Sequence, residues 1–115
     1  MNRVILIGRL TDNPEIKTAK GDLLIAEFRL AVKRRGREEP DYIPITAFRQ
    51  NAEFAQSYLT KGRLVSVEGS LQTNEWKDEE GKTHRGYEIV AESLSGLDKP
   101  KETAADAATK ELVAG

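Results

Sequence analysis

The stretch Asp41–Trp76 constrains the fold most, because its apolar spacing changes from that of a strand to that of a helix and back again. Residues 42–48 alternate between two faces, as a strand with one buried face does. Residues 51–59 carry apolar side chains at helical spacing, and Asn51 is a suitable N-cap for them. Residues 64–76 then alternate again. The pattern predicts a strand, a short helix and a second strand.

Aromatic residues at both ends of this stretch point away from the predicted core. Tyr42 and Phe48 alternate with Ile45, so they lie on the outer face of the first strand. Trp76 has the parity opposite to that of Leu71, which we place on the core side of the second strand. Packing in the core or between subunits is the alternative role for Tyr42 and Phe48, and packing in a hairpin is the alternative for Trp76.

The predicted helix carries two apolar stripes, and we assign both to the core. Ala52, Ala55 and Leu59 form the first stripe, and Phe54 and Tyr58 form the second. A helix of this length gains most of its stability from such packing rather than from its own propensity.

Further strands are predicted on both sides of this stretch. Residues 2–10 alternate, but both faces are apolar at the start, which indicates a strand covered on two sides, for example by a second subunit. Residues 16–33 form a strand region that a turn at Lys20–Asp22 interrupts. Residues 82–97 form the last strand and pair with residues 64–76 in a long hairpin.

Composition limits the chemistry of the chain. Its 115 residues are enough for one domain, predicted at residues 1–97 and followed by a flexible, alanine-rich tail at residues 98–115. The chain has no cysteine and one histidine, which excludes disulfides, thiolate metal sites and cysteine nucleophiles and leaves little for zinc. We recognise no membrane span and no signal peptide, so we expect a cytoplasmic protein that needs no cofactor.

The net charge of −1 hides an uneven distribution. Residues 1–37 carry nine Lys or Arg against four acidic residues, whereas residues 38–98 carry six against twelve. The cations of one short loop are Lys33, Arg34, Arg35 and Arg37. Such a cluster attracts phosphate, although a charge run is often only a solvated loop.

The order of three strands, one short helix and two strands is that of the OB-fold, an all-β, five-stranded Greek-key barrel. A β-sandwich has strands at similar spacing but needs no helix between the third and fourth strands, so the helix favours the barrel. Pro44 has no amide hydrogen, which requires an edge, a bulge or a locally unpaired position in its strand. OB-folds bind oligonucleotides or oligosaccharides across one face.

Several phrases of the sequence resemble those of the bacterial single-stranded-DNA-binding proteins. They are NRVILIGRLTDNPE, FRLAVKR, DYIPITAF, NAEFAQSYLTKG, VSVEGSLQT and GYEIVAE, and Trp76 stands between the last two. No single phrase is decisive, but their order and spacing match from Met1 to about Leu97. The resemblance implies an OB-fold subunit of a homotetramer that binds single-stranded DNA without sequence specificity and protects it in replication, recombination, repair or DNA uptake.

The resemblance also implies which residues form the binding site. Tyr42, Phe48 and Trp76 match the base-stacking positions of the family, and the alternation of the strands independently turns them outward. The cations that match or neighbour the family's backbone contacts are Arg3, Arg9, Lys17 and Lys61, together with Lys33, Arg34, Arg35 and Arg37 of the loop.

The chain departs from the family pattern in its loop, its hairpin and its tail. Gly36 replaces a further loop aromatic, and Gln72 and Asn74 stand where some relatives have arginine, so we expect looser binding. Residues 99–115 lack the acidic, hydrophobic-tipped peptide with which longer relatives recruit other proteins, which puts recruitment through this tail in doubt.

Two other functional classes are open. An OB-fold adaptor that binds proteins, such as a primosome component, would show little preference for single strands. An enzyme is not expected, because the carboxylates near Trp76 lack a paired histidine, a glycine-rich phosphate cradle and a nucleophile elbow. His84 could join Asp78 and Glu80 at a metal ion, but a solvated hairpin is the interpretation we favour.

Overall fold

The computed structural model describes residues 1–98. Its elements in chain order are β1 (Val4–Leu10), β2 (Glu15–Ala19), β3 (Leu23–Val32), β4 (Asp41–Phe48), α1 (Gln50–Tyr58), β5 (Leu64–Lys77) and β6 (Thr83–Gly96). The strand region predicted at residues 16–33 is two strands, because Gly21 and Asp22 both take positive φ angles and turn the chain there. The predicted tail beyond Asp98, and with it the prediction about partner recruitment, lies outside the described residues.

Five of the six strands close into a barrel, which confirms the predicted OB-fold. The hydrogen-bonded order is β1-β5-β6-β4-β3-β2, and β1 also pairs with β3, which closes the ring and leaves β2 outside it. All pairs are antiparallel except that of β4 with β6. Helix α1 lies between the third and fourth strands of the barrel, as predicted, and packs against β3, β4 and β6.

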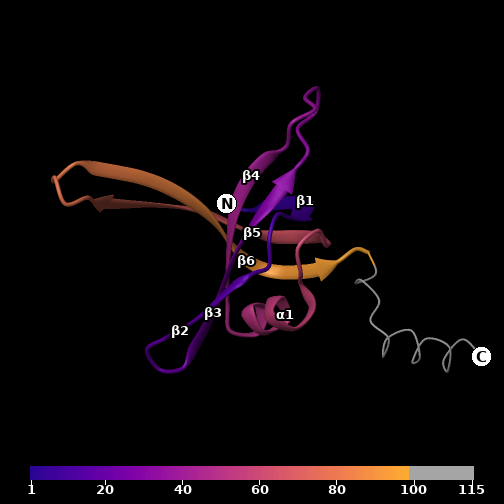
Figure 1. Ribbon diagram of the computed structural model, residues 1–115, viewed down its shortest axis with the longest axis horizontal. Coiled ribbons are helices and arrows are strands. Elements are labelled where there is room, and N and C mark those ends of the chain that lie inside the picture. The colour runs from indigo at the N-terminus through magenta and orange to yellow at the C-terminus, as the bar shows by residue number, and fades with distance from the viewer. Residues whose placement is uncertain (99–115) are drawn as a thin grey trace, which may run out of the picture.

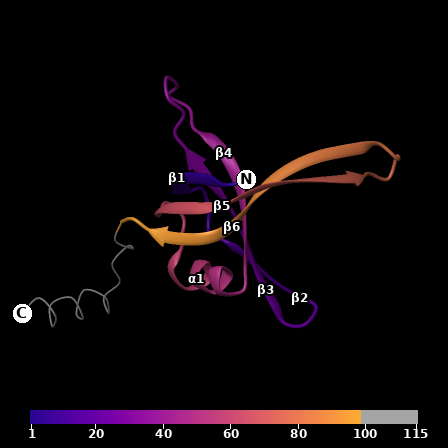
Figure 2. The ribbon, with the colours of Figure 1, turned by 180° about the vertical axis from the view of Figure 1, so that it is seen from behind.

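Segments of the chain project from the barrel in three directions (Figure 1). They are the β2–β3 hairpin, the loop that joins β3 to β4, and the outer half of the β5–β6 hairpin, and the view from behind shows the same arms (Figure 2). From Leu71 to Lys77 every residue of β5 is exposed, so the predicted long hairpin continues beyond the core. The prediction that Leu71 lies in the core is wrong, because the strand has left the barrel there and the side chain is 43% exposed.

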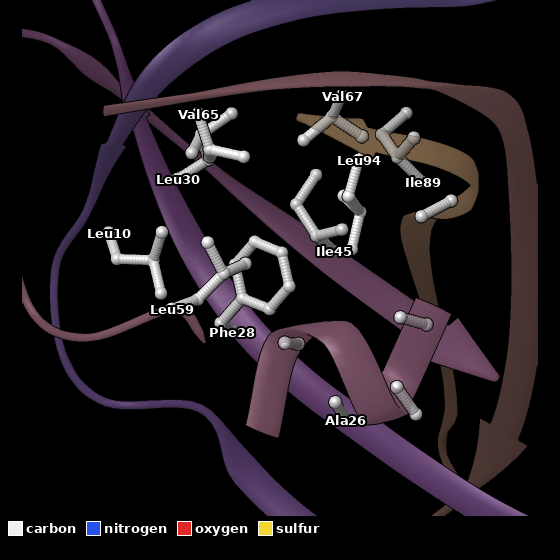
Figure 3. Packing of buried hydrophobic residues seen from close by; sticks show 14 residues of the cluster. Leu10, Ala26, Phe28, Leu30, Ile45, Leu59, Val65, Val67, Ile89 and Leu94 are labelled. Atoms are coloured by element: carbon white, nitrogen blue, oxygen red, sulfur yellow. The ribbon is translucent and has the colours of Figure 1, made fainter. Parts of the chain in front are cut away.

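The barrel encloses one hydrophobic core (Figure 3). Its largest fully buried side chains are Leu30, Ile45, Val65 and Val67. Ala52 and Ala55, from the first predicted stripe of the helix, are fully buried against it. The assignment of the second stripe to the core is wrong for Tyr58, which is exposed; its ring lies 5.2 Å from that of Phe54, and Phe54 is only partly buried. The short helix buries one face, and Tyr58 lies outside it.

The helix begins differently from the prediction. Its N-cap is Arg49, not Asn51, and no side chain caps it. Asn51 instead donates hydrogen bonds through Nδ2 to the carbonyl oxygens of Ala91 (3.3 Å) and Glu92 (3.2 Å), which ties α1 to β6. The N–H of Arg49 donates to the carbonyl oxygen of Leu24 at 3.0 Å. Contacts with neighbouring strands therefore determine where the helix starts.

Two positions show how the barrel strands meet. Gly8 lies so close to β3 that a Cβ atom there would overlap the carbonyl group of Ala31, so glycine is required where β1 closes the barrel. Pro44 lies one residue before the short parallel pairing of β4 with β6, which involves only Ile45 and Thr46. Pro44 therefore has a ladder partner in β3, Arg29, and none in β6, so one of its two sides is locally unpaired.

Candidate nucleic-acid interface

The strand register places the predicted aromatics on one side of the sheet. Ile45 of β4 pairs with Ile89 of β6, and both are buried in the core. Residues of the opposite parity face outward, and on β4 these include Tyr42 and Phe48. The register of β6 with β5 continues the same outer face to Trp76. The structure thus shows the outward parity expected for these residues, while their binding role remains a prediction.

These aromatics differ in exposure and lie apart from one another. Tyr42 and Trp76 are 54% and 52% exposed, whereas Phe48 is half-buried. Tyr42 and Phe48 stand near opposite ends of β4, about 20 Å apart at the rise of an extended strand. Trp76 lies near the tip of the β5–β6 hairpin. The face therefore offers separate stacking positions along a path rather than a single pocket.

Rows of paired residues bring a cation near each aromatic of β4. The rows are Arg9, Ala31 and Tyr42 across β1, β3 and β4, and Lys17, Ile25 and Phe48 across β2, β3 and β4. Because adjacent strands lie about 4.8 Å apart, the backbone of each cation is about 10 Å from that of its aromatic. Arginine and lysine side chains are long enough to span part of this distance, so each row places a positive charge beside an aromatic ring.

Most of the predicted phosphate-binding cations already contact a carboxylate. The N···O distances are 2.9 Å for Arg3 with Glu68, 3.1 Å for Arg9 with Asp98, 3.3 Å for Lys17 with Glu27, 2.9 Å for Arg34 with Asp41 and 3.9 Å for Arg37 with Glu39. Each of these cations is about half-exposed, so the pairs are weak and a phosphate can compete for the cation.

The other predicted cations are free of such contacts. Among the described residues, Lys33, Arg35 and Lys61 are exposed and form no ion pair. Lys33 and Arg35 flank the paired Arg34 where the β3–β4 loop begins. Lys61 follows α1, and its N–H donates to Asn13 Oδ1 at 2.9 Å. Within the predicted set, these three carry the uncompensated positive charge.

The contacts around Trp76 were not predicted from the sequence. Its indole stacks on the imidazole of His84, with ring centroids 5.5 Å apart and planes inclined by 18°. His84 Nε2 lies 2.8 Å from Asp78 Oδ2, so the prediction that these carboxylates lack a paired histidine is wrong. The hydrogen bond with His84, followed by that from the N–H of Lys82, holds the pKa of Asp78 below its usual value. Trp76 and His84 pair across the hairpin, which becomes evident only when the turn is placed.

Tyr87 is a further exposed aromatic, outside the predicted binding set. It is 47% exposed and pairs with Thr73, whose parity is opposite to that of Trp76. Tyr87 therefore lies on the other face of the hairpin, where Arg85 is held by Glu75 at 2.8 Å. The two faces of the hairpin are distinct surfaces, and only the Trp76 face is continuous with Tyr42 and Phe48.

The metal site considered for the hairpin turn does not form. Over residues 1–98, no group of three or more His, Asp or Glu side chains gathers at a distance suited to a metal ion, so Asp78, Glu80 and His84 do not make one. No helix in the described part of the chain is long and apolar enough to cross a membrane.

Comparison with known proteins assigns the family. Residues 1–97 match the Single-strand binding protein family, which is most of the chain. The chain belongs to this family. The match covers the whole barrel and the β5–β6 hairpin, so the outer face described above lies within the part that the family shares.

Individual members of the single-strand binding protein family are similar to this chain over most of their own length. "Single-stranded DNA-binding protein 1" of Staphylococcus aureus is 42% identical over 108 residues, which cover 90% of this chain and 69% of that relative. "Single-stranded DNA-binding protein 3" of Clostridium acetobutylicum is 42% identical over 103 residues, covering 85% and 72%. The solved structure of the Plasmodium falciparum SSB complex with ssDNA superposes with a TM-score of 0.77 at 32% identity, covering 85% of this chain and 96% of that one.

Proposed function

We propose that this protein binds single-stranded DNA without reading its sequence, and that Tyr42, Phe48 and Trp76 stack on its bases. The observation that carries the proposal is the outer face that these aromatics share, with Arg9 and Lys17 two strands away from the aromatics of β4. Membership of the single-strand binding protein family and likeness to an SSB solved with ssDNA support the same ligand.

Base stacking accounts for the preference for unpaired strands. Every base has a π-face that a single strand exposes and a duplex hides, and each base–aromatic contact contributes about 1–3 kcal/mol. Tyr42 and Trp76 are about half-exposed and offer free ring surface to a base. Half-buried Phe48 offers less, so we assign it a smaller share of the binding energy.

The basic residues supply the salt-dependent part of the binding. Each phosphate contact releases counterions, so affinity falls as the salt concentration rises. Lys33, Arg35 and Lys61 can contact phosphates directly, because they form no ion pair among the described residues. The cations that must exchange a carboxylate for a phosphate are Arg3, Arg9, Lys17, Arg34 and Arg37. We therefore propose a shallower salt dependence than the number of cations alone would give.

Assembly into a homotetramer fits the outer face of β1. Ile5 and Ile7 are 59% and 55% exposed on this face. β1 pairs with β3 only at Arg9 and Leu10, so the earlier part of the strand has a free edge beside these side chains. An exposed apolar edge strand is a template for association, and a second copy of the chain would cover it.

The proposed activity needs no catalytic group. Coating of single strands protects them wherever replication, recombination, repair or DNA uptake exposes them, and we place the protein in the cytoplasm beside the nucleoid. Gly36, Gln72 and Asn74 stand at positions where further stacking or charge would tighten the grip, so we propose that its binding is looser than that of relatives with those groups.

An electrophoretic shift assay tests the proposal. An unpaired oligonucleotide and a duplex of equal length are titrated with the protein at several salt concentrations. We expect retardation of the unpaired strand, with no cleavage, at concentrations that leave the duplex free. Equal retardation of both would contradict the stacking mechanism, and retardation of neither would favour the protein-binding adaptor.

A further inference from the structure

A chain of contacts runs from the hairpin turn to the indole of Trp76. In the turn, Asp78 Oδ1 accepts hydrogen bonds from the N–H groups of Glu80 (3.0 Å) and Lys82 (2.9 Å). The second oxygen, Oδ2, lies 2.8 Å from His84 Nε2. The carboxylate therefore shapes the turn with one oxygen and holds the histidine with the other.

The imidazole held in this way lies against the indole. The rings of His84 and Trp76 are 5.5 Å apart and inclined by 18°, which is a stacked arrangement. The edge of the indole lies over Gly86, where a Cβ atom would be only 3.1 Å from Cζ3. The ring of His84 lies against one side of the indole, and the backbone of Gly86 lies at its edge. Together they confine Trp76.

The protein core provides no other support at this position. Every residue of β5 from Leu71 to Lys77 is exposed, because the hairpin has left the barrel. A tryptophan on such an arm would lose side-chain freedom when a base stacks on it, and that loss would weaken binding. A ring that already orders the indole removes this cost, and 52% of Trp76 still remains exposed for a base.

We propose that His84, held by Asp78, is a positioning residue that orders the Trp76 indole for stacking on an unpaired base. The inference rests on the proposed function, because it takes Trp76 as a base-stacking residue. Asp78 is the charged group that contacts the imidazole, at 2.8 Å. Glu80 and Lys82 lie 3.9 Å from each other in the turn, and the Arg85–Glu75 pair lies on the opposite face.

The first test uses the free protein and needs no DNA. Trp76 is the only tryptophan, so the emission of the chain reports on its surroundings alone. The stacked imidazole covers one side of the indole, so we expect His84→Ala to expose the ring further to water and to shift its emission to longer wavelength. His84→Phe keeps a ring in place and should leave the emission maximum close to that of the unaltered protein. An emission maximum that His84→Ala leaves unchanged would overturn the contact, whatever the protein binds.

The second test measures coupling in DNA binding. His84→Ala should weaken binding of an unpaired oligonucleotide about three- to tenfold, as the loss of an aromatic pair suggests, while His84→Phe should stay within about twofold. Thr83→Ala, on the opposite parity of the same strand, is the matched control and should leave affinity unchanged. Thermal midpoints of all variants establish that the fold is intact.

A double-mutant cycle decides whether His84 acts through Trp76. In a Trp76→Ala background, His84→Ala should have no further effect on affinity, because the residue it positions is gone. Independent losses in the two variants would overturn the positioning role and leave the proposed function intact. If Trp76→Ala itself left affinity unchanged, the stacking role of Trp76 and the positioning role of His84 would both be wrong, even if His84→Ala shifted the emission as expected.

Discussion

Arg34 forms two hydrogen bonds with the carboxylate of Asp41, from Nε to Oδ2 at 2.9 Å and from Nη2 to Oδ1 at 3.0 Å. Asp41 immediately precedes Tyr42, so the pair ties the β3–β4 loop down beside a proposed stacking residue. Arginine binds phosphate with the same forked geometry. Asp41 therefore occupies the place on Arg34 that a DNA phosphate would take.

Removal of the Asp41 charge should strengthen binding. In Asp41→Asn the guanidinium of Arg34 loses its competing anion, and we expect affinity for an unpaired oligonucleotide to rise about two- to fivefold at low salt, with a steeper salt dependence. Fluorescence titration at several salt concentrations measures both. Glu39→Gln is the control, because its carboxylate lies 3.9 Å from Arg37 and forms a looser pair. Unchanged affinity would show that Asp41 orients Arg34 without competing for it.

Arg35, which forms no ion pair among residues 1–98, should contribute more to the salt dependence than Arg34, which is paired with Asp41. Arg35→Gln removes a cation that is free to contact phosphate, so the slope of log affinity against log salt should flatten by about 0.7. Arg34→Gln should flatten it less, because Asp41 already neutralises part of that charge. Neither change should alter the extent to which DNA quenches Trp76. A larger effect of Arg34→Gln would mean that the loop rearranges on binding.

Parity along a strand explains what could be predicted from the sequence. Tyr42 has the outer parity of β4, whose other parity is buried at Ile45 and Ala47, and it is exposed. Trp76 has the outer parity of β5, but it is exposed because the whole hairpin has left the barrel there. Parity does not reveal how much of a strand the core covers, and Leu71 has core parity but is exposed where β5 leaves the barrel. Helical spacing likewise does not show which stripe of α1 contacts the barrel, and Tyr58, predicted in the core, is exposed.

Contacts between distant parts of the chain could not be predicted in this way. The pairing of β1 with β5 and of β5 with β6 brings Arg9 within 3.1 Å of Asp98. The stack of Trp76 on His84 depends on the register of two strands across a turn. The positive charge left for phosphate is therefore set by tertiary register, which a count of basic residues does not reveal.

Asp98 fastens the end of β6 to the barrel. Its Oδ1 accepts a hydrogen bond from the N–H of Leu64 at 3.2 Å, and its Oδ2 accepts one from Arg9 at 3.1 Å. Burial raises the pKa of Asp98, but the Leu64 hydrogen bond, Arg9 and the charge of Arg63 outweigh burial and hold the pKa below its usual value. A carboxyl group with a lowered pKa in the folded state stabilises the fold above its unfolded-state pKa, and this contribution is lost as the pH falls through the folded-state value.

Asp98→Asn should accordingly lower the thermal midpoint by a few degrees at neutral pH. The difference from the unaltered protein should persist down to the usual carboxyl pKa of about 4. It should shrink as the pH falls further, through the lowered folded-state pKa, because Asp98 then becomes protonated in the folded protein. Melting curves recorded by circular dichroism across this range measure it. A difference that stayed constant down to pH 2 would assign the effect to the altered hydrogen bonds rather than to the charge.

Truncation tests the same anchor. A chain that ends at Lys99 keeps Asp98 and should bind single strands within a few-fold of the full chain, since the removed residues include no aromatic. A chain that ends at Leu97 loses the anchor and should melt at a lower temperature than the chain ending at Lys99. Equal melting of the two shortened chains would mean that Asp98 contributes nothing to stability.

Charge placed on the outer face of β1 should disrupt assembly. Light scattering of the unaltered protein at micromolar concentration should give the mass of a tetramer, and Ile5→Asp or Ile7→Asp a smaller one, because a buried carboxylate opposes the contact. Tyr58→Asp is the matched control, since Tyr58 is 58% exposed and Ile5 59%. A monomer mass for the unaltered protein would contradict the proposed tetramer.

Trp76→Ala should weaken the binding of single-stranded DNA without lowering the stability of the fold. The side chain is half-exposed on an arm beyond the core, so its removal leaves the barrel intact, while the lost stacking contact should cost about 1–3 kcal/mol in binding. Anisotropy of a labelled oligonucleotide measures the affinity of Trp76→Ala, and saturable quenching of Trp76 emission follows binding in the unaltered protein. Tyr87→Ala, with similar exposure on the opposite face, should bind normally. If Trp76→Ala unfolded, or if DNA left the emission unchanged, Trp76 would be a packing residue of the hairpin and the bases would have to stack elsewhere.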